Sequence, residues 1–114
     1  MIVQRIGVRE ESPLDAAAAF YRGLLPATRA AMSANEEDLL LIFEPTDYTH
    51  RAWRLAAVQQ LARDNAPRRV NGIESADPAA MAAARDFLAA APGVTGQYLV
   101  LDSQGAGAVV DEGA

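Results

Sequence analysis

Four polar side chains that follow apolar segments of this chain are its candidates for binding chemistry. They are Glu44, Asp47, Arg51 and Glu74. The first three come after an apolar run at 38–43, and the last follows a second, more polar run at 68–73 that is expected to form a strand. If these runs are neighbouring parallel strands, the four side chains share one edge of a sheet, where open α/β sheets bind ligands. Two interpretations stay open: helix caps with loop charges, or a small acidic pocket for a cation or polar metabolite.

Metal and thiol chemistry have little support in this sequence. His50 is the only histidine, so a metal site built on it would need carboxylate partners such as Asp47 and Glu44. We expect His50 to lie on an exposed helix surface instead, and we predict no metal site. Asp47 and Arg51 have the spacing of a weak surface ion pair, with a remnant anion or ligand site as the alternative. The chain has no Cys and therefore no disulfide, thiol nucleophile or thiolate ligand.

The segments that carry these residues alternate between strand and helix. Strands are expected at 1–8, 38–43, 68–73 and 97–102, and helices at 12–34, 46–65 and 77–91. Thr46 or Asp47 can cap the central helix, and Pro26 should kink or interrupt the first helix because it lacks an amide hydrogen. This order predicts an α/β fold with a four-stranded parallel sheet and three main helices. We expect one domain at 1–104 and a flexible tail at 105–114.

Two groups of motifs occur in order along the chain. The first runs from Arg51-Ala52 through Leu61-Ala62-Arg63-Asp64 to Arg69-Val70-Asn71, and the second occupies 86–102 with Phe87-Leu88 and Thr95-Gly96-Gln97. They resemble the Lys-Ala, Leu-Ala-x-Glu, Arg-Val-Asn, Phe-Leu and Thr-Gly-Gln patterns of short-chain dehydrogenases/reductases. The resemblance implies a truncated Rossmann-like domain. Its four strands would correspond to the last four of the family's sheet.

The resemblance also implies a degenerate nucleotide site. The turn after the first strand, 9–12, is acidic and has no Gly, whereas dinucleotide binding needs a Gly-rich turn whose amides approach the pyrophosphate. The family's Pro-Gly that lines the nicotinamide pocket is replaced by Glu74-Ser75. We therefore expect no cofactor and no cofactor-binding residue.

The reaction pair of that family is missing as well. Its chemistry needs a Tyr that donates a proton and a Lys four residues later that lowers the pKa of the Tyr. One alignment places Asp47 and Arg51 at these positions, and the other places Tyr48 and Ala52 there. We carry over no catalytic residue and predict that Tyr48 packs against the sheet.

Composition limits the partners and the cell compartment. A net charge of −5 and a pI near 4.7 argue against nucleic acid, which binds basic surfaces. No apolar run reaches the roughly 18 residues of a membrane span. All ten basic residues are Arg, which suggests a GC-rich genome. We expect a cytoplasmic bacterial protein.

We expect a non-catalytic, homo-oligomeric structural or interaction protein. The alternatives are a small-metabolite-binding module and a subunit that completes an oxidoreductase with another chain. A helical wheel places Trp53, Ala57 and Leu61 on the side of the central helix away from the sheet, which predicts a homodimer contact. Two competing arrangements stay open: edge pairing by the first strand, or burial of Trp53 by the first helix or the tail within one chain.

Overall fold

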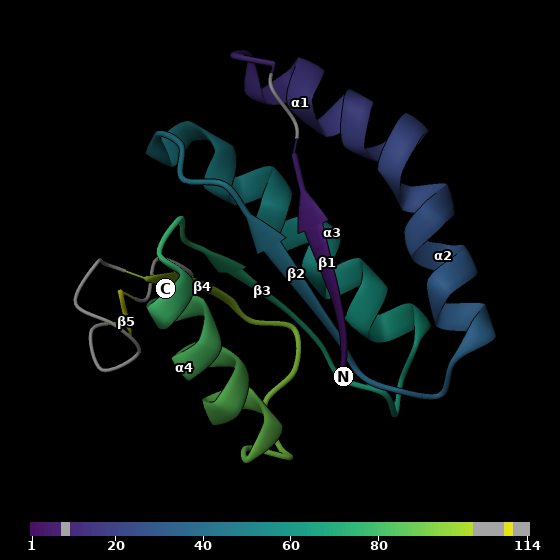
Figure 1. Cartoon of the computed structure of the whole chain (residues 1–114). Helices are drawn as coiled ribbons and strands as arrows, with labels where there is room; N and C mark the ends of the chain where they lie inside the picture. The colour runs from purple at the N-terminus through teal and green to yellow at the C-terminus, as the bar shows by residue number, and fades with distance from the viewer. Residues whose placement is uncertain (8–9, 102–108, 111–114) are drawn as a thin grey trace.

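A single sheet organises the protein. The computed structural model describes residues 1–7, 10–101 and 109–110. Its strands are β1 (Ile2–Ile6), β2 (Leu39–Phe43), β3 (Val70–Glu74), β4 (Tyr98–Leu101) and β5 (Val109–Val110), and they lie in this order across the sheet (Figure 1). The first four are parallel, as predicted, and β5 pairs antiparallel with β4. The expected flexible tail at 105–114 stays a prediction: β5 lies within it, and its other residues lie outside the described residues.

Three helical segments connect the strands, as predicted. They are α1 (Pro13–Ala19), η1 (Phe20–Leu24) and α2 (Leu25–Ala34) as one segment, η2 (Tyr48–His50) and α3 (Arg51–Asp64) as the second, and α4 (Pro78–Ala89) as the third. The expected interruption at Pro26 is confirmed, because the π-helical η1 precedes it and the Leu25 amide bonds the Phe20 carbonyl. Ser12, Asp47 and Asp77 cap the three segments.

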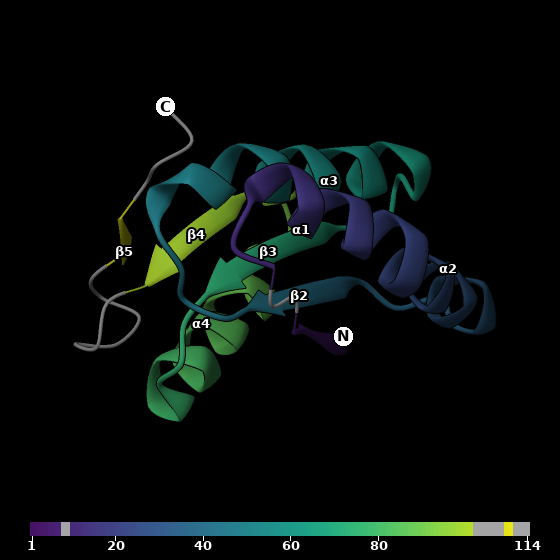
Figure 2. The same cartoon turned by 90° about the horizontal axis from the view of Figure 1, so that it is seen from above.

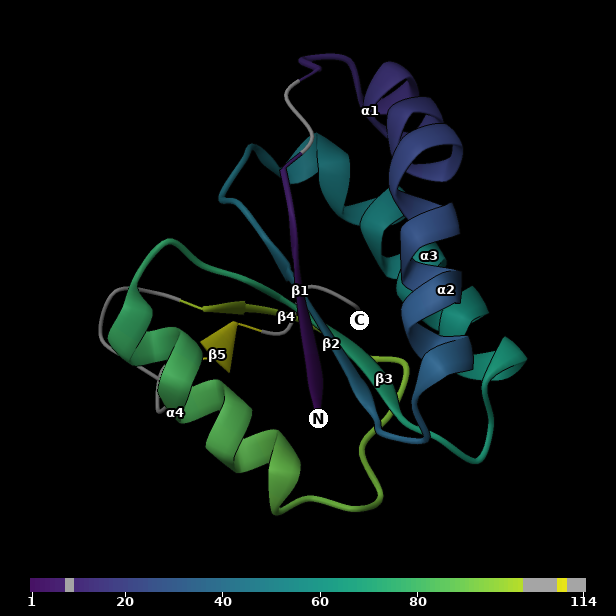
Figure 3. The ribbon, with the colours of Figure 1, turned by 45° about the vertical axis from the view of Figure 1, so that its right-hand side comes forward.

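The helices cover the two faces of the sheet unequally. Figure 2 shows α1, α2 and α3 above the sheet and α4 below it, and Figure 3 shows the same separation from the side. All five side chains of β2 are buried, because Leu39, Leu41 and Phe43 join the core under α3 while Leu40 and Ile42 join the core against α4. This burial explains the continuous apolar run of β2.

Motif residues near the amino end of β4 hold the sheet together. The Asn71 amide group donates to the Val94 carbonyl over 2.9 Å, and its oxygen accepts from the Gln97 amide over 3.1 Å. Thr95 Oγ1 accepts from the Val70 amide, and Gly96 supplies a φ of +71°. The Arg-Val-Asn and Thr-Gly-Gln motifs therefore contact one another and fix the turn that leads into β4.

The predicted outward stripe of α3 is wrong, because it faces the sheet. Ala57 and Leu61 are 1% and 3% exposed, and the Trp53 ring lies 5.7 Å from Phe20 and 6.1 Å from Phe43 between ring centres. Phe20 belongs to the first helical segment, so burial of Trp53 within one chain is the arrangement observed. These side chains cannot serve as a free dimer surface in this fold.

The helical wheel assigned the wrong face of α3 to the core because apolar residues occur on both faces of this helix. Its buried side includes the charged Arg54, while exposed alanines, Ala52 and Ala56, lie on its outer side. Apolarity is thus spread around the helix, and the apolar stripe that normally identifies the core face is weak.

Candidate functional site

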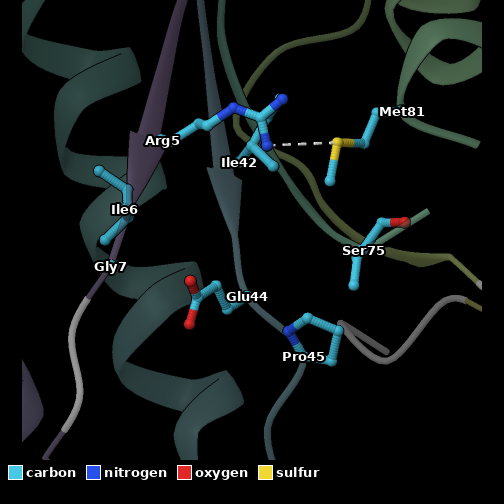
Figure 4. Close-up of a pocket in the computed structure, with 9 residues that line it drawn as sticks. Arg5, Ile6, Gly7, Ile42, Glu44, Pro45, Ser75 and Met81 are labelled. Carbon is cyan, nitrogen blue, oxygen red and sulfur yellow. Dashed lines mark hydrogen bonds between the residues drawn. The ribbon is translucent and has the colours of Figure 1, made fainter. Parts of the chain in front are cut away.

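Two adjacent cavities open at the carboxyl ends of β1, β2 and β3. The β1 cavity has a volume of about 400 Å³ and the α3 cavity about 500 Å³, and Glu44 and Pro45 line both. The β1 cavity, drawn in Figure 4, is lined by Arg5, Ile6, Gly7, Ile42, Glu44, Pro45, Ser75, Ala76 and Met81. The α3 cavity is lined by Glu10, Glu11, Glu44, Pro45, Thr46, Asp47, His50 and Arg54. The expected ligand edge of the sheet is therefore hollowed.

The structure brings only part of the predicted pocket together. Glu44 and Asp47 both line the α3 cavity. Glu74 instead lies beneath it, 4% exposed, and the cation that lines the α3 cavity is Arg54 rather than Arg51. The ion pair between Asp47 and Arg51 stays a prediction.

A buried network joins α3, β3 and β4 below the cavities. Arg54 Nη1 donates to the Glu44 carbonyl at 2.9 Å, to Glu74 Oε1 at 3.3 Å and to the Tyr98 hydroxyl oxygen at 3.1 Å. Tyr98 in turn donates a very short hydrogen bond to Glu74. Burial, and then the bond to Glu74, raise the pKa of Tyr98 well above its usual value. Tyr98 therefore stays protonated in the folded protein.

Arg54 is the functional residue that the sequence analysis missed. Its guanidinium carbon lies 4.9 Å from the centre of the Phe43 ring and 5.7 Å from that of Trp53, so aromatic faces enclose the charge. A signal existed, since Arg54 precedes the buried Val58 and Leu61 by four and seven residues and thus shares their helix face. A charge on an apolar face requires a buried partner, which here is Glu74.

His50 is buried, so the prediction of an exposed histidine is wrong. The residue is 3% exposed, and its Nδ1 accepts a hydrogen bond of 3.1 Å from Trp53 Nε1. Nε2 lies 3.0 Å from the Glu11 carbonyl oxygen and donates to it in the tautomer that this arrangement requires. The loop before α1 packs over the start of α3, which the sequence did not reveal. His50 thereby fixes this loop beside the α3 cavity.

The two candidate positions of the catalytic Tyr, Asp47 and Tyr48, lie at the start of the turn before α3, whereas the Lys positions, Arg51 and Ala52, open the helix itself. The Asp47 carboxylate accepts from the hydroxyl and the amide of Thr49, and these bonds lower its pKa. Tyr48 is 75% exposed, so its predicted packing against the sheet is wrong. The physical reason is that Tyr48 opens the 3-10 turn η2 and is out of phase with the wheel of α3.

The electrostatics of the α3 cavity favour cations over phosphates. Among the described residues that line it, four carry carboxylates, Glu10, Glu11, Glu44 and Asp47, and one, Arg54, carries a guanidinium. Within residues 1–7, 10–101 and 109–110, no group of three or more His, Asp or Glu side chains is placed to hold a metal ion. Over the same residues, no helix has the length and apolarity needed to cross a membrane.

The family comparison agrees with the fold and with the clustered motifs. Residues 4–101 match the family described as "Short chain dehydrogenase-like protein" (SDR-like). The chain belongs to this SDR-like family. The match includes most of β1 and all of β2, β3 and β4, together with all three helical segments, which confirms the resemblance seen in the sequence. No curated protein and no solved structure matches the chain.

Proposed function

We propose that this SDR-like chain is a non-catalytic domain that acts as a homodimeric structural or interaction protein. The observation that carries the proposal is the geometry before α3. Tyr48 is 75% exposed, and the residue four positions later is Ala52, which has no charge to lower the pKa of a phenol. In the other alignment, Asp47 serves as the N-cap of the helical segment.

The phenol that does lie beside a cation is poorly suited to proton transfer. Tyr98 is 3% exposed and contacts Arg54, but burial and the bond to Glu74 raise its pKa. A catalytic acid is most effective when its pKa lies near the working pH. This favours a structural role for Tyr98.

Cofactor titration tests the non-catalytic part of the proposal. We expect isothermal titration calorimetry of the full chain with NADH and with NADPH to give no saturable heat, because the acidic turn that includes Glu10 and Glu11 repels the pyrophosphate. A reductase with an intact Gly-rich turn serves as the positive control. A micromolar dissociation constant for either nucleotide would overturn this part.

A homodimer would use a different face of α3 from the one first predicted. Ala52 and Ala56 are exposed along the outer side of the helix, with half-buried Leu55 between them and exposed Tyr48 at its start. Small side chains let two helices approach closely, and a two-fold axis would bring the same face of a second copy against it. We propose this outer face as the homodimer contact.

Sedimentation velocity over a concentration series tests the homodimer. We expect a dimer for the wild type and a monomer for Ala56→Glu, which adds two like charges across the axis. Ala82→Glu is the matched control, because Ala82 is equally classed as exposed but lies on α4. Val3→Glu on the edge strand β1 tests the competing edge pairing. A wild type that is monomeric throughout would refute the homodimer, and loss of the dimer only in Val3→Glu would relocate the contact.

A second candidate function, small-ligand binding, is favoured by the two cavities. They lie at the carboxyl ends of parallel strands, the usual ligand edge of open α/β sheets. Binding a small metabolite is compatible with a non-catalytic domain. A thermal-shift screen with small polar metabolites would test it, and the absence of any stabilising compound would count against it.

A further inference from the structure

Two side chains of opposite charge line the β1 cavity, and neither has a strong partner among the described residues. Arg5 projects from β1. Within the described residues, the one hydrogen bond of its side chain runs from Nη1 to the Met81 sulfur at 3.6 Å. Glu44 follows β2, and over the same described residues its carboxylate accepts no hydrogen bond. Figure 4 shows the guanidinium and the carboxylate apart from each other along the cavity. Both charges are therefore available to a ligand.

Apart from Ser75, the other described residues that line the β1 cavity have no polar side chain. Ile6, Ile42, Pro45 and Met81 are among them. The volume of about 400 Å³ lies near the lower end of the range for ligand pockets, roughly 300 to 1,000 Å³. The cavity thus matches a small molecule with an apolar body and polar ends.

We propose that the β1 cavity binds a zwitterionic amino acid with an aliphatic side chain. Its carboxylate would bond the Arg5 guanidinium, its ammonium would bond the Glu44 carboxylate, and its side chain would lie against Ile42. This inference rests on the second candidate function, small-ligand binding. An anion alone would face the charge of Glu44, and a cation alone would face that of Arg5. A zwitterion compensates both charges.

Replacement of the Met81 sulfur by a ligand carboxylate as the hydrogen-bond acceptor of Arg5 favours binding. A thioether is a weak acceptor, whereas a carboxylate can accept two parallel N–H bonds from one guanidinium. Replacing the contact with Met81 by a carboxylate therefore gains stronger, charge-assisted bonds. The Arg5 side chain is exposed, so this exchange requires no opening of the core.

Calorimetry with three matched probes tests the charge requirement. L-leucine has both charges, isocaproate lacks the ammonium and isoamylamine lacks the carboxylate. We expect saturable binding of L-leucine and at least about tenfold weaker binding of each analogue, the scale of one lost charge-assisted bond. Equal binding of isoamylamine and L-leucine would overturn the zwitterion while preserving ligand binding. No binding of any probe would overturn the zwitterion; the small-ligand function would fall separately, if the metabolite screen also found no ligand.

Charge-neutral variants then assign each end of the ligand. We expect Arg5→Gln to weaken the binding of L-leucine about tenfold and to leave the binding of isoamylamine unchanged. Glu44→Gln should weaken the binding of L-leucine and leave that of isocaproate unchanged. Arg29→Gln and Glu36→Gln are matched controls, because both residues are exposed and lie outside the cavity. Unchanged L-leucine affinity in both cavity variants would overturn the proposed site.

Discussion

Replacement of Arg54 by Met should be among the most destabilising single changes in this protein. The variant keeps much of the aliphatic stem between Phe43 and Trp53 but removes the charge. Its ionic partner, Glu74, has 5% side-chain exposure and lies 3.3 Å away. A carboxylate left in that position keeps the bond from Tyr98 but loses its cation. The expected cost is about 3 to 5 kcal/mol, the usual penalty for breaking a buried ion pair from one side.

Urea unfolding of the variants measures this cost. A domain of this size has roughly 5 to 15 kcal/mol of stability, so Arg54→Met should move the midpoint strongly without changing the slope. Arg63→Met is the matched control, because Arg63 is exposed on the same helix, and it should stay within about 0.5 kcal/mol of the wild type.

A double variant separates charge burial from packing. Addition of Glu74→Gln removes the orphaned carboxylate, so the double variant should be more stable than the sum of the two single effects predicts, by about 1 to 3 kcal/mol. If Arg54→Met costs less than about 1 kcal/mol, or if the two effects simply add, the pair is solvated and the reasoning fails.

Three further predictions concern the same region. Because the pKa of Tyr98 is raised on folding, its contribution to stability is complete below the usual Tyr pKa near 10 and decreases as the pH rises beyond it. The unfolding free energy of the wild type should therefore fall more steeply with alkaline pH than that of Tyr98→Phe. Gly72→Ala should cost about 1 to 3 kcal/mol in urea unfolding, because its Cβ would lie 2.9 Å from Val58 Cγ2, whereas Gly23→Ala, with open space around it, should not destabilise. Tyr48→Phe should change the unfolding free energy by less than about 0.5 kcal/mol, because the phenol is exposed, and a larger loss would indicate a contact made in solution.

The order of elements was predictable because its signals are local. The Ser12 and Asp77 caps, the buried run of β2 and the position of Pro26 each depend on backbone chemistry within a few residues. The Thr-Gly-Gln motif could be found in the sequence for a related reason, since the Thr95 hydroxyl bonds β3 and Gly96 adopts a positive φ.

The candidate site was less predictable because it depends on contacts between distant segments. His50 is buried by the Glu11 loop, 39 residues earlier in the chain, and Arg54 on α3 is neutralised by Glu74 on β3. The wheel of α3 places Arg54 on the same face as Val58 and Leu61, but it could not reveal that Phe43 and Trp53 enclose the guanidinium on that face. Once Arg54 is taken as a core residue, the outward position of Ala52 and Ala56 follows.

The position of Glu74 connects the family resemblance with the proposed loss of catalysis. In the resemblance, the position of Glu74, the last residue of β3, belongs to the Pro-Gly that lines the nicotinamide pocket. Here Glu74 is 4% exposed and bonds Arg54, Tyr98 and the Thr46 amide, so it joins β3 to α3, to β4 and to the loop beyond β2. A carboxylate committed to these bonds cannot be exchanged for a cofactor contact without exposing a buried charge. Glu74→Pro should therefore destabilise the fold rather than confer nucleotide binding, because the buried Arg54 would lose its carboxylate partner.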